Sequence, residues 1–197
     1  DHIAEQAVHN LDAINWGLQS NPIKAYASGG RLQRTDPKYG DVYDHFSVDY
    51  DYPGQVRVGF KCRQIAGAKG RVSNRFCGSL GTMDIRPSPG STATVVRDLK
   101  GKIIWKNNGK KDNNAPYEQE HMDLIASIRS GNPIMEIQEV ADSSMTAIIG
   151  RESAYSGQEV SFDWGTKESK MKLAPDDLSA DSNPVRPVPV PGQYKLV

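Results

Sequence analysis

The chain has 197 residues and carries 24 Lys and Arg against 24 Asp and Glu, so its formal net charge is zero. A nucleic-acid-binding protein needs an excess of positive charge to neutralise phosphates, so this balance argues against that class. Hydrophobic residues make up 37% of the chain and occur in ordered bursts, which favours a folded domain over disorder, and no apolar run reaches the roughly 20 residues of a membrane-spanning helix.

Two cysteines, Cys62 and Cys77, are too few for a disulfide framework. We expect two ordinary half-buried thiols. The alternative is a single disulfide bond between them, since they fall on successive predicted strands. No signal peptide opens the sequence, because residues 1–5 run directly into a helical pattern. We therefore expect a piece of a longer protein, whose compartment this pattern does not identify.

The N-terminal segment is predicted to be an amphipathic helix over residues 3–20, because apolar residues recur there every three or four positions. Pro22 ends the pattern, since the residue before a proline disfavours the α conformation. The side of this helix opposite the apolar stripe carries four residues: Glu5, His9, Asp12 and Trp16.

Alternating apolar and polar residues then predict strands. Residues 42–52 and 55–65 flank a Pro53-Gly54 turn and predict a long hairpin. Residues 106–114 read as a polar loop. Shorter strands are predicted over residues 23–27, 71–77, 81–86, 93–99 and 103–106.

Two helices and a tail complete the chain. Pro116 suits the first position of a helix that Gly131 ends, and a further helix over residues 137–156 is rich in small residues that let it lie close to a sheet. Residues 160–164 predict a last edge strand. The proline-rich residues 176–197 predict an extended tail, which is either disordered or a strap across a neighbouring subunit.

This order of elements predicts an α+β fold, with one large open, mostly antiparallel sheet and helices packed on one face, over residues 1–175. No G-x-G-x-x-G follows a strand into a helix, so the chain does not predict a dinucleotide-binding fold of its own. The other sheet face would stay open, and we expect self-association through it. Alternating apolar residues would supply that surface: Val42, Phe46, Val48 and Tyr50.

The spacing Glu5-x-x-x-His9-x-x-Asp12 is the first candidate for chemistry. On a helix it places carboxylates about one turn from an imidazole, where they orient the ring and raise its basicity, as a general base requires. A solvated polar face explains the same spacing. A zinc site is not supported, because H-E-x-x-H is absent.

Asp12 and four further residues are candidates for binding a ligand. Tyr43 and His45 would share one face of a strand, where they would bind hydroxyl groups or form an ordinary polar pair. Arg63 would bind carboxylate or sugar oxygens, or form an interstrand salt bridge. His121 falls within the apolar face of its helix, where a core histidine is the alternative.

In their order and spacing, several motifs resemble the Gfo/Idh/MocA oxidoreductases, the group of glucose-fructose oxidoreductase, inositol dehydrogenase and rhizopine catabolism. The resemblance covers about residues 3–175. Its motifs are residues 5–16 (EQAVHNLDAINW), 40–46 (GDVYDHF), 62–64 (CRQ), 120–129 (EHMDLIASIR) and 147–151 (AIIGR).

The resemblance implies the C-terminal domain of an enzyme that binds NAD or NADP mainly through a Rossmann domain absent from this chain. It implies a sugar or cyclitol substrate and a homo-oligomer formed through the sheet. His9 matches the family's acid/base histidine, Glu5 stands where the family usually has an aspartate, and Asp12 matches a downstream aspartate.

Two other functions fit the same resemblance. One is a glycosidase or lyase that oxidises its sugar transiently and recycles NAD, which net NADH production would separate from a dehydrogenase. The other is a non-catalytic carbohydrate-binding or oligomerisation module, in which changing His9 leaves activity intact. Family members that carry the motif of residues 43–46 are often exported, which indicates the periplasm, and the cytoplasm stays open.

Overall fold

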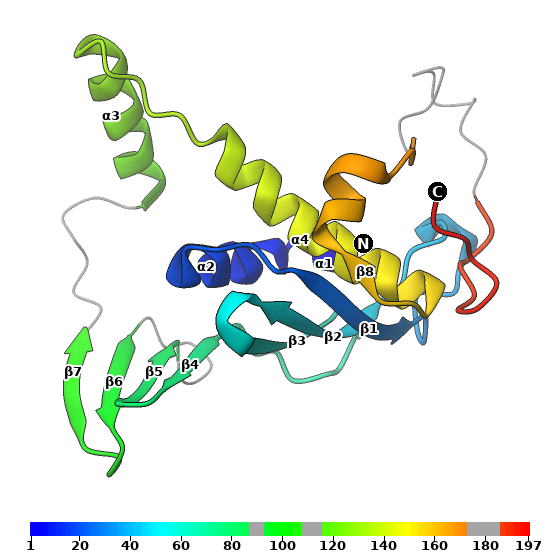
Figure 1. Ribbon diagram of the computed structural model, residues 1–197, viewed down its shortest axis with the longest axis horizontal. Coiled ribbons are helices and arrows are strands. Elements are labelled where there is room, and N and C mark those ends of the chain that lie inside the picture. The colour runs from blue at the N-terminus through cyan, green and yellow to red at the C-terminus, as the bar shows by residue number, and fades with distance from the viewer. Residues whose placement is uncertain (87–92, 108–115, 173–185) are drawn as a thin grey trace. The chain divides into compact units, whose positions relative to one another are not determined.

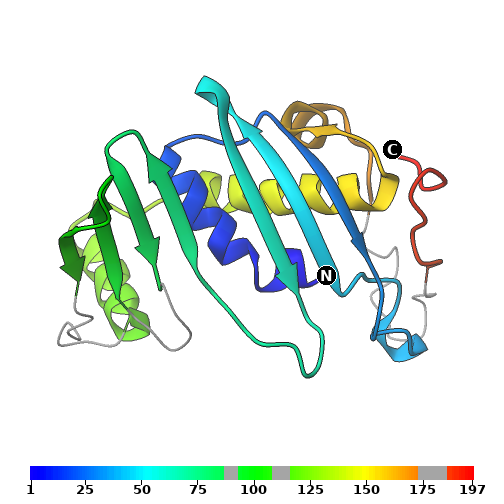
Figure 2. The ribbon, with the colours of Figure 1, turned by 90° about the horizontal axis from the view of Figure 1, so that it is seen from below.

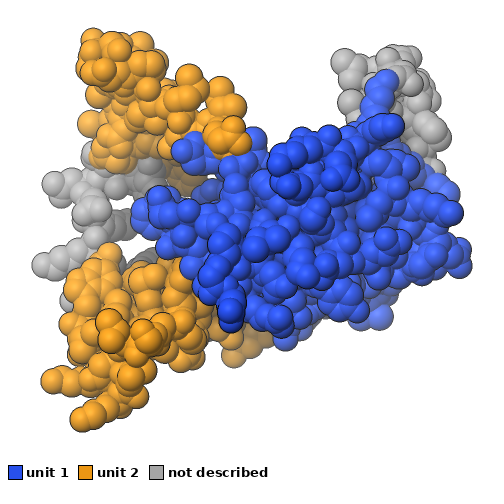
Figure 3. Space-filling view, viewed as in Figure 1, with its two compact units in different colours: residues 1–68, 139–197 blue, residues 69–138 orange. Residues whose placement is uncertain are grey.

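The computed structural model describes residues 1–86, 93–107, 116–172 and 186–197. The chain divides into two compact units, unit 1 with residues 1–68 and 139–197 and unit 2 with residues 69–138 (Figure 3). Helices occur together with strands whose described pairings are all antiparallel, which confirms the α+β class.

The prediction of one large sheet is wrong, because hydrogen bonds join the strands into two four-stranded sheets. Pairing along the first sheet stops at Arg63 and resumes in the second at Asn74. The residues between them turn at Gly67, which has a φ of +78°, and extend neither ladder.

The sheet of unit 1, sheet A, has the strand order β3-β2-β1-β8. β2 and β3 form the predicted hairpin around a turn in which Gly54 has a φ of +72° (Figure 1). The strands are β1 (Lys24–Gly30), β2 (His45–Tyr52), β3 (Val56–Arg63) and β8 (Val160–Ser161).

Three helices of unit 1 lie on one face of sheet A: α1 (His2–Glu5), α2 (Val8–Leu18) and α4 (Ile137–Ser156) (Figure 2). The helix predicted over residues 3–20 is therefore two helices. The amide of Ala7 donates to the carbonyl of His2, five residues earlier, so the regular i to i−4 ladder is interrupted there.

The core of unit 1 lies between sheet A and these helices. Alternate residues of β2 are buried there, while the residues between them lie on the open face, where Ser47 and Asp49 are exposed. The expectation that the open face of the sheet is apolar was thus wrong. The apolar residues that alternate along β2 all point to the opposite face, toward the helices. The buried residues are Phe46, Val48, Tyr50 and Tyr52.

The helix α4 packs closely on the sheet through small residues, as predicted. A Cβ atom at Gly150 would lie 2.3 Å from the Tyr50 hydroxyl oxygen, so this crossing requires glycine. The same Tyr50 hydroxyl donates to the carbonyl of Thr146 at 3.0 Å. Ser153 accepts a hydrogen bond from the Ala27 amide at 2.9 Å, which ties α4 to β1.

The sheet of unit 2, sheet B, runs in chain order and confirms four predicted strands. The helix α3 (Pro116–Arg129) begins at the predicted proline, and most of the predicted polar loop before it lies outside the described residues. The strands are β4 (Asn74–Gly78), β5 (Gly81–Ile85), β6 (Thr94–Asp98) and β7 (Ile103–Asn107).

The predicted last strand is shorter than expected, because β8 ends at Ser161 and a π-helix follows over Trp164–Glu168. The described part of the tail, residues 186–197, packs on unit 1. The Gly192 amide donates to the Ser156 carbonyl at 2.9 Å. None of the described helices is long and apolar enough to span a membrane.

Candidate functional site

The outward face of α2 carries three of the residues that the sequence placed there: His9, Asp12 and Trp16. All three are exposed, and Trp16 leaves 75% of its surface accessible. At about 100° per residue, their side chains fall within an arc of about 60°. We call these three residues the outward face.

Buried contacts on the other side of α2 fix its rotation. Leu11 is fully buried and Ile14 nearly so. The buried Asn15 donates to the Thr146 hydroxyl at 3.0 Å and accepts from the Tyr52 hydroxyl at 2.6 Å. The outward face therefore points away from sheet A, and Asp12 at its edge contacts α4.

Asp12 is oriented by the neighbouring helix. The Ser143 hydroxyl donates to its Oδ1 at 2.6 Å. In the parts of the chain that the structure describes, its Oδ2 has no hydrogen-bond partner. One oxygen of an exposed carboxylate is thus available to accept a hydrogen bond from a ligand.

Glu5 does not make the predicted pair with His9. It is the last residue of α1, and the helix break at Gln6 and Ala7 separates it from α2. Among the described residues no hydrogen bond or ion pair joins Glu5 to His9. The spacing argument failed here because it assumes an uninterrupted helix.

A second polar cluster lies at the start of β2. The carboxylate of Asp44 is fully buried, and its Oδ2 accepts hydrogen bonds from the amides of Leu32, Gln33 and Arg34 at 2.7–3.0 Å. Its Oδ1 lies 2.8 Å from Nδ1 of His45. Burial alone would raise the pKa of Asp44, but these hydrogen bonds stabilise the carboxylate and lower its pKa to about 2.

His45 lies on the open face of sheet A, opposite Arg63 in the register. A Cβ atom at Gly30 would lie 3.2 Å from its Cε1, so the ring covers that glycine. The helices, including α2, cover the other face of this sheet (Figure 2). The structure therefore does not bring His45 and Arg63 together with His9.

Tyr43 lies in the core rather than beside His45, because the strand begins only at His45. It is 4% exposed, and its hydroxyl donates to the Pro189 carbonyl at 2.8 Å. Its ring packs edge-on against Tyr155, with ring centres 4.6 Å apart. The expectation that Tyr43 and His45 share one face was wrong.

His121 is exposed, which contradicts the core position that was its ordinary alternative. Its Nδ1 donates to the Tyr117 carbonyl one turn earlier in α3, at 2.6 Å. The apolar face of α3 is itself uncovered among the described residues, and Ile128 is 62% exposed. His121 belongs to unit 2, and its role in a site stays untested.

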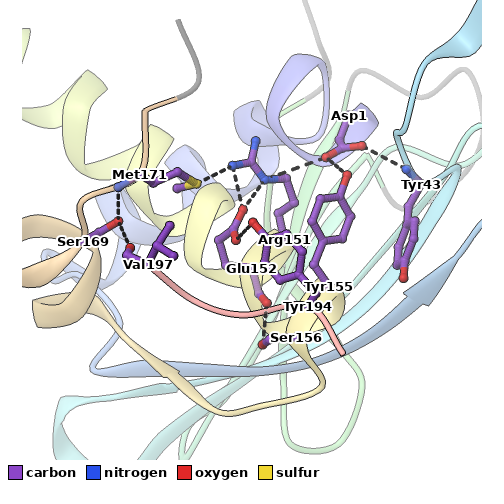
Figure 4. Close-up of polar contacts among 10 residues, drawn as sticks. All are labelled: Asp1, Tyr43, Arg151, Glu152, Tyr155, Ser156, Ser169, Met171, Tyr194 and Val197. Atoms are coloured by element: carbon purple, nitrogen blue, oxygen red, sulfur yellow. Dashed lines mark hydrogen bonds and ion pairs between the residues drawn. The ribbon is translucent and has the colours of Figure 1, made fainter. Parts of the chain in front are cut away.

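The structure reveals a polar network in unit 1 that the sequence did not predict (Figure 4). The guanidinium of Arg151 contacts Oε1 of Glu152 at 2.8 Å, and the Tyr194 hydroxyl donates to Oε2 of Glu152 at 2.8 Å. The Tyr155 hydroxyl donates to Asp1 at 2.7 Å. Burial, together with the Glu152 carboxylate, raises the pKa of Tyr194 to about 12.

These residues border a hollow of about 740 Å³, which none of the predicted site residues lines. Both oxygens of Glu152 have partners, so the network ties α4 to the C-terminal segment. Its signal in the sequence was the adjacent opposite charges, Arg151 and Glu152, inside a helix of small residues.

The cysteines do not supply a nucleophile. Both are free thiols, as predicted, but only Cys62 is half-buried, because Cys77 is exposed. Burial raises the pKa of Cys62 to about 12, so this thiol stays protonated at neutral pH. In the described residues no group of three or more His, Cys, Asp or Glu side chains is arranged to hold a metal ion.

No protein-family model matches the sequence, and no curated protein matches it. Solved structures do share its fold. One is an aldose-aldose oxidoreductase from Caulobacter crescentus complexed with glycerol, at 18% identity and a TM-score of 0.62, with 78% of this chain and 45% of that chain covered.

Two further structures have the same fold. A myo-inositol 2-dehydrogenase from Lactobacillus plantarum has a TM-score of 0.58 at 17% identity, covering 78% of this chain and 46% of that one. An oxidoreductase from Agrobacterium radiobacter in complex with NAD+, L-tartaric acid and magnesium has a TM-score of 0.59 at 14% identity. The match covers 80% of this chain and 48% of that one. The chain thus spans less than half of each.

The described residues do not fit a dinucleotide. Such a cofactor is held at the carboxyl edge of a parallel sheet, where a glycine-rich loop leads into a helix. All described strand pairings of this chain are antiparallel.

Proposed function

We propose that this chain is the substrate-side domain of an NAD(P)-dependent oxidoreductase of the Gfo/Idh/MocA type that acts on a sugar or cyclitol. Two independent observations support the proposal: the order of the sequence motifs, and a fold shared with sugar and cyclitol oxidoreductases. The observation that carries it is the outward face of α2, which holds His9 and Asp12 in solvent on a fixed helix.

In this proposal His9 is the acid/base residue and accepts the proton of the reacting hydroxyl. Asp12 accepts a hydrogen bond from a neighbouring hydroxyl through its Oδ2, since Ser143 already occupies Oδ1. Glu5 acts on His9 only through the electrostatic field, because no contact joins them among the described residues. NAD or NADP is held by a domain outside these 197 residues.

The test uses the complete enzyme with NAD and NADP and a panel of aldoses and myo-inositol, following NADH or NADPH formation. We expect turnover of at least one substrate, and His9→Ala to lower it by about 10²–10⁴-fold, the range for a lost general base. Asp49→Ala is the control, because it removes an exposed polar side chain from the open face of sheet A, opposite the face that α2 covers.

Other results would identify the other functions. Cleavage of a glycoside that needs NAD but yields no net NADH would indicate the cofactor-recycling glycosidase. Carbohydrate binding without turnover, unchanged in His9→Ala, would indicate a binding module and would contradict the proposal.

A further inference from the structure

The hollow beside the polar network of unit 1 is bounded by four parts of this one compact unit. They are Asp1, the loop at residues 40–42, the second half of α4 and the C-terminal segment at residues 186–194. Its volume of about 740 Å³ falls within the roughly 300–1,000 Å³ of sites that hold small molecules. The proposed function does not use this hollow, because none of the outward-face residues lines it.

Arg151 brings hydrogen-bond donors to the hollow that no neighbour uses. Its side chain is only 13% exposed, and its Nε and Nη2 lie 2.9 and 2.8 Å from Oε1 of Glu152. Among the residues that the structure describes, Nη1 of Arg151 has no hydrogen-bond partner (Figure 4). Unpaired donors of a largely buried group are costly, so water or a ligand in the hollow must accept from them.

The charges around Arg151 argue against an anion as that ligand. Glu152 contacts the guanidinium, and Oδ2 of Asp1 lies 3.9 Å from its Nε. The hollow as a whole is lined by three acidic and two basic side chains, so it offers no excess of positive charge. A further negative charge at Nη1 would be repelled by both carboxylates, whereas a neutral hydroxyl oxygen fits these donors.

Asp41 supplies the acceptor that hydroxyl protons require. It lines the hollow and makes no hydrogen bond or ion pair within the described parts of the chain. Pro187, Val188 and Val190 add an apolar wall. A donor, an acceptor and an apolar wall together suit a sugar or cyclitol ring, because its hydroxyl groups donate and accept while its C–H face is apolar.

We infer that the hollow is a binding site for a neutral polyhydroxylated ring, a sugar or a cyclitol. One hydroxyl oxygen accepts from Nη1 of Arg151, and another hydroxyl donates to Asp41. Since Arg151 belongs to α4 and the apolar wall belongs to the C-terminal segment, the bound ring connects the two. Binding therefore holds residues 186–194 more firmly on unit 1. The inference does not depend on the proposed function, because it uses neither His9 nor a cofactor.

The experiment measures amide hydrogen exchange of the complete protein by mass spectrometry, with and without glucose or myo-inositol. At saturation with at least one of these probes, we expect exchange in residues 186–194 to slow about fivefold or more. Asp41→Ala should raise the probe concentration for half-maximal protection about tenfold, the effect of losing one hydrogen bond to a charged group. Asp49→Ala removes an exposed carboxylate of β2 and is the matched control, which should leave the protection unchanged.

Glucuronate and inorganic phosphate test the charge argument. Both should protect residues 186–194 less than the neutral probes do at the same concentration. Stronger protection by either anion would overturn the inference. Protection by neither neutral probe, or protection that Asp41→Ala leaves unchanged, would also overturn it.

His9→Ala separates this inference from the proposed function. Protection that persists in His9→Ala would support a ligand in the hollow, whether or not the protein forms NADH. Protection that is lost in His9→Ala would assign the ligand to the outward face and overturn the inference, while sugar-dependent NADH formation would still support the proposed function.

Discussion

At the scale of single residues, Asp44 shows how one carboxylate organises a loop. Its Oδ2 accepts hydrogen bonds from three consecutive backbone amides and its Oδ1 faces the ring of His45, while the side chain itself is fully buried. A carboxylate with this many donors is stabilised in its charged form. The loop at residues 32–34 therefore depends on Asp44 for its conformation.

We expect Asp44→Ala to lower the free energy of unfolding by about 3 kcal/mol, because it leaves several donors without an acceptor. Urea denaturation of the protein measures the change. Asp49→Ala is the control, since Asp49 is exposed on the same strand and should change stability by less than about 0.5 kcal/mol. Equal effects of the two variants would contradict this role for Asp44.

The same carboxylate predicts a pH dependence. Its pKa is about 2 in the folded protein and near 3.8 without the fold, so the group contributes stability above pH 4 that is lost as the pH falls toward 2. The contribution amounts to about 2 kcal/mol. Denaturation curves between pH 5 and 2 should show this loss in the wild type and a smaller loss in Asp44→Ala.

Substituting His9 should lower turnover and leave the stability of the fold nearly unchanged. His9→Ala is expected to change the free energy of unfolding by less than about 0.5 kcal/mol, because the side chain is exposed. Glu5→Gln should lower turnover less than His9→Ala, since the two residues make no contact among the described residues. Normal turnover with a large loss of stability in His9→Ala would make this histidine structural.

At the scale of elements, the crossing of α4 over β2 depends on the absence of a side chain at Gly150. A Cβ atom there would lie 2.3 Å from the Tyr50 hydroxyl oxygen and 3.3 Å from Cδ1 of Ile3. Neither neighbour has room to move, because Tyr50 and Ile3 are both fully buried.

We expect Gly150→Ala to destabilise the protein by about 2 kcal/mol through overpacking, although alanine is the better helix former. Adding Tyr50→Phe should recover part of the loss, because it removes the atom that clashes. Val140→Ala, at an exposed position of α4, serves as the control. Thermal unfolding of the three variants measures the differences.

These elements also show what the sequence could predict. The limits of α4 were predicted correctly, since small residues run along the helix and Gly157 follows it. The break after α1 was missed because Ile3, Ala7 and Leu11 keep the helical period and stay buried across it. Periodicity reports which side chains face the core, and it does not report the backbone hydrogen bonds between them.

The same limit of periodicity applies to the candidate site, of which the sequence could predict only the exposed helix face. The exposed face with His9 and Asp12 follows from the helical period alone. The role of Asp44 depends on amides 10 to 12 residues away, which no local pattern encodes. Tyr43 was assigned to the wrong face, because the alternation does not show where the strand begins.

At the scale of the whole chain, the absence of a dinucleotide-binding fold among the described residues leads to a binding prediction. We expect the 197-residue chain to fold and to show no micromolar binding of NAD or NADP, because the loop that cradles phosphates is missing from the sequence. Calorimetry tests this. Micromolar binding by this chain would place a cofactor site within it.

The open face of sheet A predicts how copies of the protein would associate. It carries Lys24, Lys61 and Arg57 beside Asp49 and Asp51, with exposed Tyr26 among them. Self-association through this face should weaken as salt is added, because exposed charge pairs are screened. Light scattering at low and high ionic strength measures it, and salt-independent association would point to another surface.

Unit 1 is built from two separate stretches of the chain, residues 1–68 and 139–197, and this affects how it folds during synthesis. Tyr50 and Thr146, which are hydrogen-bonded across its core, are 96 residues apart. The hairpin of β2 and β3 therefore leaves the ribosome long before α4, and the part of its apolar side that α4 covers is exposed in the meantime. Until α4 is synthesised, that surface is available to chaperones and to other nascent chains. A transcript that ends before α4 should accordingly yield an aggregating product.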